Sequence, residues 1–219
     1  MDIQIMKEYL PLYIDALWLT LKIGLLGIVL SLVVGVFTAL FRFYKIPVLD
    51  KLSGAYIELF RNTPLLVQLF FLYFALPRIG IKMDAATCGV LGLTLLGGAY
   101  MAESIRSSLE AIDKIQTDSA LALGMNRRQV MTKVVLPQAI SISIPSIVAN
   151  VIFLLKETSV FSAISLMDLM FTAKDLIGLY YKTVEALALL VIFYLIILLP
   201  VSFLGDYTER RLSYARSGN

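Results

Sequence analysis

Long runs without charged residues constrain this chain more than any other feature of its sequence. Residues 23–41 and 186–205 contain no Asp, Glu, Lys or Arg, and each run is about 20 residues long. An α-helix of about 20 apolar residues spans the hydrocarbon core of a bilayer, which is about 30 Å thick. Because 59% of the 219 residues are hydrophobic and only 16% are charged, the chain is typical of a polytopic membrane protein.

Five apolar segments are expected to cross the membrane as helices, which predicts an all-α fold. Pro137 and Pro145 interrupt the fourth apolar run, so we expect its membrane helix to begin only after the second proline. Residues 162–181, between the last two spans, predict a short amphipathic helix at the membrane face. The expected spans are 23–41, about 55–77, 85–102, about 146–160 and 186–205.

Lysine and arginine residues are distributed unevenly between the two sets of loops. The loops at one end of the predicted spans hold twelve of these residues, and the loops at the other end hold five. Basic residues flanking short loops favour the cytoplasmic side, so the richer set is expected there. With an odd number of spans, we expect residues 1–15 to form an N-terminal extracytoplasmic segment, 16–205 the transmembrane domain and 206–219 a cytoplasmic C-terminal tail.

Several kinds of site are excluded by the residues that the chain lacks. It has no histidine, which rules out a His-based triad or a histidine metal cluster, and Cys88 is its one cysteine. It also lacks a Gly-x-x-x-x-Gly-Lys-Ser/Thr phosphate loop. We therefore expect no enzyme activity, no metal and no cofactor bound by this chain, and no nucleic-acid partner.

A polar, basic segment, residues 117–139, separates the third and fourth apolar runs. Asp118 can cap a short helix, Gly124 can adopt the left-handed conformation that ends it, and Asn126 can cap a second helix. The segment therefore predicts a helix, Gly, helix knob on one membrane surface, where it could simply rest on the bilayer. The second helix would be amphipathic, with Met125 on its apolar side and Arg127 and Arg128 on its polar side.

The spacing within this knob resembles the signature loop of permease subunits of ATP-binding-cassette (ABC) importers. That family has Glu-Ala-Ala, three residues, Gly, nine residues, Ile, one residue and Leu-Pro, and the frame is filled here by residues 118–120, 124, 134 and 136–137. The resemblance implies a cytoplasmic coupling helix that contacts a separate ATPase, on which ATP and magnesium would bind. The residues implied in this contact are Asp118, Ser119, Ala120, Leu123, Gly124, Met125, Arg127, Arg128, Leu136 and Pro137.

Lys156 and Glu157 are charged residues within the apolar zone, where an ionised side chain costs about 2.5 to 3.5 kcal/mol. Adjacent helix residues point about 100° apart, so one of the two can face a central cavity while the other pairs with a neighbouring helix. A purely structural ion pair remains the alternative. Glu103 and Arg106 can likewise pair as neighbours three residues apart, either structurally or as part of a gate.

Pro64 marks a second candidate cluster, because it removes a backbone donor and disfavours a helical Thr63. Broken helices in membranes commonly line cavities, although a simple kink is the alternative.

Residues 58–68, 99–106 and 156–159 resemble the polar-amino-acid uptake permeases of the same family. The resemblance implies a type I ABC importer permease fold with five transmembrane helices in a bacterial cell membrane. It also implies four partners besides the membrane lipid: an ATP-binding subunit dimer, a second permease copy, an extracytoplasmic substrate-binding protein, and a polar amino acid or cystine as cargo. The residues expected on the substrate path are Asn62, Thr63, Pro64, Gln68, Lys156, Glu157, Thr158 and Ser159.

Two other functions are compatible with a polytopic membrane chain. A self-sufficient, ion-coupled amino-acid carrier would need no ATPase, but such carriers often contain internal repeats and none is obvious here. A membrane scaffold or sensor would transport nothing.

Overall fold

The computed structural model describes the backbone of residues 3–217 and the side chains of residues 3–209. Within this range every regular element is a helix, as the apolar runs predict. The helices are α1 (Ile3–Phe43), α2 (Leu49–Arg61), α3 (Leu65–Phe70), η1 (Phe71–Ala75), η2 (Leu76–Ile79), α4 (Ala85–Glu110), α5 (Lys114–Ala122), α6 (Arg127–Val130), η3 (Met131–Val135), α7 (Leu136–Glu157), η4 (Thr158–Ile164), α8 (Leu169–Tyr180) and α9 (Thr183–Ser217).

Four stretches of the described chain are long and apolar enough to cross a membrane as continuous helices: α1, α4, residues 127–164 and α9. The second predicted span is different, because α2 and the following helical segment to Ile79 meet at an angle of 103°. Counting this bent pair as one span gives five. The first span also begins earlier than expected, since α1 starts at Ile3 and continues through residue 23 without a break.

The prediction that the fourth membrane helix begins after Pro145 is wrong. The helix continues from α6 through η3 into α7, with Pro137 in its first turn and Pro145 in its interior. Residues 131–135 form a π-helical turn, in which the Leu136 N–H donates to the Met131 carbonyl. A π-turn changes the hydrogen-bond register locally, so a nearby proline without an N–H is accommodated instead of ending the helix.

Helix α4 lies at the centre of the bundle and makes its most extensive contact with α1. Small side chains allow this close approach, because helices in lipid associate by van der Waals packing and interhelical hydrogen bonds. Ser31 of α1 is fully buried, and its hydroxyl donates to the carbonyls of Gly27 at 2.7 Å and of Leu93 on α4 at 2.9 Å. The α1–α4 pair therefore forms the frame on which the other helices are placed.

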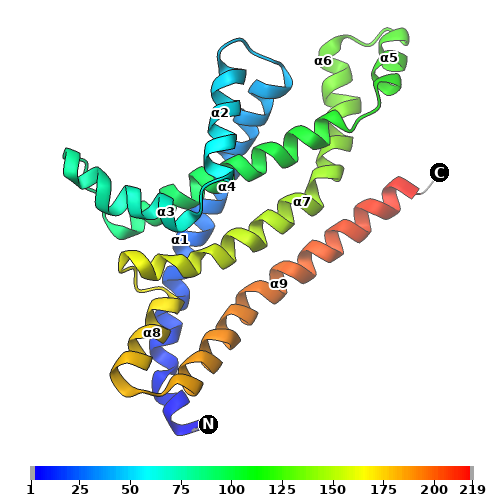
Figure 1. The fold of residues 1–219 in the computed structure, drawn as a ribbon. Helices are drawn as coiled ribbons and strands as arrows, with labels where there is room; N and C mark the ends of the chain where they lie inside the picture. The colour runs from blue at the N-terminus through cyan, green and yellow to red at the C-terminus, as the bar shows by residue number, and fades with distance from the viewer. Residues whose placement is uncertain (1–2, 218–219) are drawn as a thin grey trace.

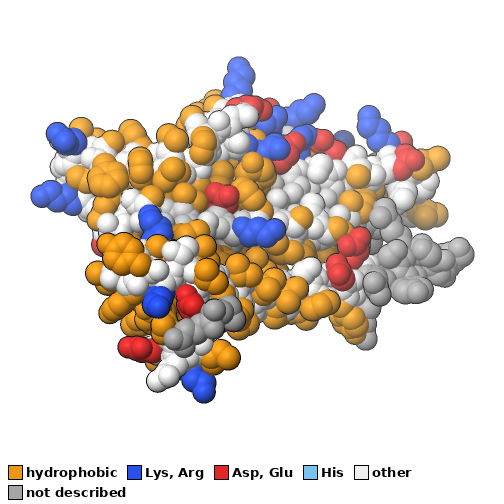
Figure 2. Space-filling view, turned by 60° about the horizontal axis from the view of Figure 1, so that its bottom comes forward, with side chains coloured by type: hydrophobic (Ala, Val, Ile, Leu, Met, Phe, Trp, Pro, Cys, Tyr) orange, Lys and Arg blue, Asp and Glu red, His pale blue; other side chains and the backbone are white. Residues whose placement is uncertain are grey.

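The outer surface of the bundle is apolar. Leu25, Val29 and Phe37 on α1 and Val191 and Ile196 on α9 are each more than 50% exposed. Figure 2 shows apolar side chains over much of one face, with charged side chains along its margins and at several places within it. Such a surface is suited to lipid and not to water.

The ends of the bundle differ in the segments that they carry (Figure 1). Helices α5 and α6, the α1–α2 turn and the C-terminal part of α9 lie towards one end. The N-terminus and α8 lie at the opposite end, where Asp168 caps α8 by accepting the Phe171 N–H at 3.0 Å. A helix is thus present between the last two spans, but α8 (Leu169–Tyr180) is shorter than the expected amphipathic helix at 162–181, because residues 158–164 form the separate helix η4 and Asp168 caps the start of α8.

Candidate functional site

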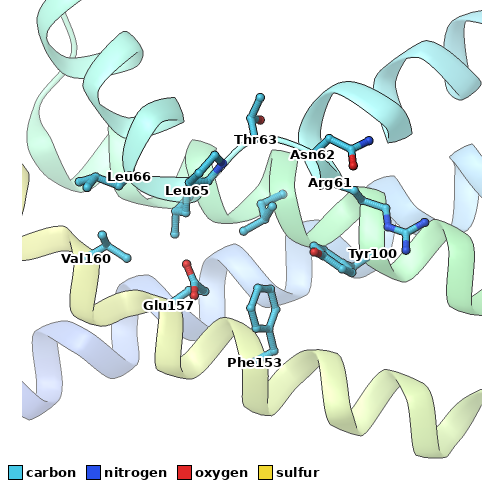
Figure 3. A pocket seen from close by; sticks show the side chains of 11 residues that line it. Arg61, Asn62, Thr63, Leu65, Leu66, Tyr100, Phe153, Glu157 and Val160 are labelled. Carbon is cyan, nitrogen blue, oxygen red and sulfur yellow. The ribbon is translucent and has the colours of Figure 1, made fainter.

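A cavity of about 480 Å³ lies where the corner between α2 and α3 faces α4 and α7. The corner itself, residues 61–66, contributes six of its eleven lining residues (Figure 3). Glu157 and Val160, at the α7–η4 junction, face the corner from the other side. The broken helix therefore lines a cavity, which is the reading favoured over a simple kink. The lining residues are Arg61, Asn62, Thr63, Pro64, Leu65, Leu66, Leu96, Tyr100, Phe153, Glu157 and Val160.

Glu157 is the acidic residue of this cavity. Its side chain is half-buried, and its carboxylate points into the space below the corner (Figure 3). The neighbouring Lys156 is exposed and does not line the cavity. The ion pairs found among the described side chains lie elsewhere in the molecule, so Glu157 faces the cavity without a protein counter-charge at contact distance.

Two aromatic rings separate Glu157 from a cationic group. The Arg61 guanidinium lies 5.2 Å from the centroid of the Tyr100 ring, which is within the range of a cation–π contact. The centroids of the Tyr100 and Phe153 rings are 5.2 Å apart. The cavity thus presents a carboxylate and a guanidinium at different places on its wall, with an aromatic surface between them.

A second, smaller cavity of about 310 Å³ adjoins the first. It is lined by Ile57 and Glu58 together with three residues that both cavities share, Arg61, Asn62 and Tyr100. The Asn62 amide donates to the Glu58 carboxylate at 3.0 Å, which ties the two polar side chains together. The polar lining of the first cavity therefore continues onto the face of α2.

The predicted substrate-path residues divide into two groups in the structure. Asn62, Thr63, Pro64 and Glu157 line the first cavity, whereas Lys156 is exposed outside it. The remaining three do not line it either: Gln68 and Thr158 are buried and Ser159 is half-buried.

The sequence analysis did not single out Tyr100 or Phe153 as cavity residues. Aromatic residues are common in apolar helices, so nothing in composition distinguishes these two from core residues. The available signal was that Tyr100 falls in segment 99–106 and Arg61 in segment 58–68, both already noted for their resemblance to the uptake permeases.

Glu103 and Arg106 form the ion pair expected from their spacing. Arg106 also contacts Glu110 at 2.6 Å, so one guanidinium links three successive turns of α4. None of these residues lines the first cavity.

The knob at residues 114–130 has the helix, Gly, helix form predicted from its turn residues. Gly124 adopts a φ of 83°, the left-handed conformation expected of it. Asn126 and Gln129 form a capping box, with the Asn126 side chain accepting the Gln129 N–H at 2.9 Å. The expected cap at Asp118 is wrong: Asp113 caps α5 by accepting the Ile115 N–H at 3.0 Å, and Asp118 lies inside that helix.

One side of the knob is anchored and the other is free. Ala120 and Val130 are buried in a small apolar cluster with Leu109 of α4 and Ala139 of α7. Leu123, beside Gly124 at the tip, is 84% exposed. Among the other predicted contact residues, Met125 is partly buried. The exposed ones are Asp118, Ser119, Arg127, Arg128, Leu136 and Pro137. The knob thus presents a projecting surface of mixed polarity that is rigidly attached to two membrane helices.

The sequence pattern of one protein family, described as "Binding-protein-dependent transport system inner membrane component", matches residues 31–214. The chain belongs to this family. Membership makes the chain an inner-membrane component of a transport system that depends on a binding protein.

Known relatives of the permease match it over nearly their whole length. The "Probable amino-acid ABC transporter permease protein PatM" of Vibrio harveyi is 37% identical over 98% of this chain and 97% of its own. The "Arginine transport system permease protein ArtQ" of Bacillus subtilis (strain 168) is 33% identical over 93% of each chain. The "Probable glutamine ABC transporter permease protein GlnM" of the same organism is 32% identical over 97% and 98%.

Solved structures confirm the type I importer permease fold expected for the permease. A structure described as "Crystal structure of an amino acid ABC transporter with histidines" superposes with a TM-score of 0.90 and 34% identity, covering 96% of this chain and 99% of that one. An inward-facing structure of the MetNI methionine ABC transporter gives a TM-score of 0.78 at 19% identity over 94% and 98%, a likeness of fold alone.

Proposed function

We propose that the permease carries a polar amino acid across the membrane through the cavity at the α2–α3 corner. The observation that carries this proposal is the placement of Glu157 and Arg61 on the wall of one cavity, with Tyr100 between them. An amino acid bears an ammonium and a carboxylate, which complement a carboxylate and a guanidinium respectively. The relatives described as glutamine and arginine permeases support this class of cargo.

Energy enters through the knob, in this proposal. The exposed surface around Leu123 and Gly124 contacts a separate ATP-binding subunit, which binds the ATP and magnesium. This contact can couple ATP hydrolysis to transport only if it differs between the two states of the ATPase. A partner that binds both states equally well does not shift the equilibrium between them. A rigid knob suits that role, since Ala120 and Val130 fix it to α4 and α7.

The knob then lies in the cytoplasm, and the N-terminal end of α1 lies outside. This assigns residues 1–15 to the extracytoplasmic side, 16–205 to the permease domain and 206–219 to the cytoplasmic tail; part of these terminal segments lies outside the described residues. The binding protein delivers cargo at the end of the bundle that carries α8, and a second permease copy completes the path. The uneven distribution of Lys and Arg supports this orientation.

The test is uptake in vesicles that contain the permease with its ATPase and its binding protein. We expect ATP-dependent accumulation of radiolabelled glutamine, arginine or cystine, and none with the permease alone. Uptake driven by an ion gradient without the ATPase would refute the proposal in favour of a secondary carrier. ATP hydrolysis that ignores both binding protein and amino acid would favour a scaffold.

A further inference from the structure

The α2–α3 corner breaks the hydrogen-bond ladder of a membrane helix. Pro64 has no N–H, so the Phe60 carbonyl lacks the donor that a continuous α-helix would place four residues later. The Val67 N–H donates to the Pro64 carbonyl at 3.1 Å and therefore does not serve the Thr63 carbonyl. Non-helical backbone at membrane depth is tolerated where it is buried in protein or lines a cavity, and neighbouring side chains can satisfy the carbonyls that the break frees.

Side chains of the corner supply these partners. Thr63 Oγ1 donates to the Leu59 carbonyl at 2.9 Å, and Asn62 Nδ2 adds a 2.7 Å bond to the Glu58 carbonyl, which already accepts the Asn62 N–H at 3.3 Å. Gln68 Nε2 donates to the Phe60 carbonyl at 3.1 Å and to the Thr63 carbonyl at 3.0 Å. The Gln68 amide thus replaces the N–H that is missing at Pro64, and it links α3 to the end of α2 across the corner.

The Gln68 side chain is held by its donors and not by its acceptor. It is only 8% exposed, and its Nε2 also lies 3.0 Å from Thr63 Oγ1. Its Oε1 is buried and has no hydrogen-bond partner among the described residues. The two amide protons are therefore the part of this side chain that the fold uses.

The two helices that meet at the corner are fixed independently of Gln68. Tyr56 on α2 donates from its hydroxyl to the Leu95 carbonyl of α4 at 2.6 Å. Leu69 on α3 is fully buried against Gly92 of α4, where a Cβ would lie 2.8 Å from Leu69 Cδ2. Loss of the Gln68 amide would leave these helices in place and release mainly the link between them, residues 62–64.

We propose that Gln68 is a positioning residue for the cargo: it does not touch the cargo but sets the shape of the cavity wall formed by residues 61–66. This inference rests on the proposed cargo path through that cavity. It assigns to Gln68 a different role from the direct contact that the sequence suggested.

The test uses the purified permease–ATPase complex and two radiolabelled probes, glutamine and arginine. In Gln68→Met, which keeps the length of the side chain but removes both donors, we expect the Kd for the bound probe to rise about three- to tenfold. The amount of complex in the membrane and its basal ATP hydrolysis should stay near wild type. Gln68→Glu keeps the shape of the side chain and, when its carboxyl is protonated, retains one donor. Its Kd should therefore lie between those of the wild type and of Gln68→Met.

The matched control is Thr94→Val. This variant removes the hydrogen bond that the mostly buried Thr94 hydroxyl donates to the Val90 carbonyl at 2.7 Å. Thr94 lies on α4, which contributes other residues to the cavity wall, but Thr94 itself does not line the cavity. Its Kd should be unchanged.

Three outcomes overturn the positioning role: an unchanged Kd in Gln68→Met, an equal rise in Thr94→Val, or failure of both Gln68 variants to accumulate. Glu157→Gln, measured in parallel, separates this inference from the cargo path itself. If Glu157→Gln alters binding and Gln68→Met does not, only the positioning role fails. If neither alters binding, the cargo path fails.

Discussion

Gly35 lies at a close approach of α1 to α4, which makes its substitution by alanine a sharp test of the packing. A Cβ at this position would lie 2.5 Å from the Met101 Cβ, 3.1 Å from the Ala102 nitrogen and 3.2 Å from the Met101 carbonyl carbon. The shortest of these distances is about 0.9 Å less than 3.4 Å, where ordinary van der Waals contact begins. The nearest atoms are a Cβ and backbone atoms, and none of them can rotate away.

The cost of Gly35→Ala follows from this geometry. Helix α1 must move away from α4 by about 1 Å, and overpacking of this kind costs about 1 to 3 kcal/mol. Alanine favours a helix over glycine by up to about 1 kcal/mol, which offsets part of that cost. Because the clashing atoms cannot move aside, the upper part of the overpacking range, about 2 to 3 kcal/mol, applies here. An offset of about 1 kcal/mol then leaves a net loss of about 1 to 2 kcal/mol, which lowers Tm by roughly 2 to 8 °C for a chain of this size.

The assay is thermal unfolding of the purified permease in detergent, followed by intrinsic fluorescence. Gly178→Ala is the matched control, because nothing lies within 4 Å of a Cβ at Gly178 and its φ is negative. We expect the control to keep the wild-type Tm or to raise it slightly. A wild-type Tm in Gly35→Ala, or an equal loss in Gly178→Ala, would refute the reasoning about the α1–α4 contact.

Three further predictions concern function and pH. Gly124→Pro imposes a φ near −65° where the structure has 83°, and it removes the N–H that donates to the Leu121 carbonyl. Uptake should therefore be lost, while the amount of permease in the membrane, measured by immunoblot, should stay at the wild-type level. Glu157→Gln should lower transport of arginine more than that of glutamine, measured as the ratio of uptake rates, because it removes the negative charge from the cavity; an unchanged ratio would argue against contact with cargo. Asp168 lies outside the membrane-spanning segments, and burial raises the pKa of its carboxyl to about 6. Because the pKa of this carboxyl is higher in the folded than in the unfolded state, the protonated carboxyl favours folding at low pH. The free energy of unfolding should fall by up to about 3 kcal/mol as pH rises from about 4 to 6. In Asp168→Asn, unfolding curves should show a weaker dependence of this free energy on pH.

Two features of the knob that depend on a few adjacent residues were predicted correctly. The left-handed Gly124 and the cap at Asn126 follow from groups within three or four positions in the chain. The cap at Asp118 failed for an instructive reason. Asp113 and Asp118 are equally good capping residues, and the choice depends on where α4 ends, at Glu110, which no local pattern specifies.

Features that depend on rotation about a helix axis were not predictable. Lys156 and Glu157 are equivalent from spacing alone, and the way in which α7 packs against α4 turned Glu157 towards the cavity. Tyr100 and Phe153 are ordinary apolar-helix residues until the two helices bring their rings to 5.2 Å.

By itself, the sequence determined that this chain is a membrane-spanning helical bundle with a polar knob. Backbone in contact with lipid must satisfy its own hydrogen bonds, which favours helices, and the length of each apolar run shows where a helix crosses the membrane. Only the tertiary structure decided which side of each helix faces lipid, core or cavity. It also decided that the chain turns by 103° at Pro64, with the amide of Gln68 replacing the missing donor. These outcomes depend on contacts between residues far apart in the chain, as where Gly92 of α4 receives Leu69 of α3, and no local pattern contains them.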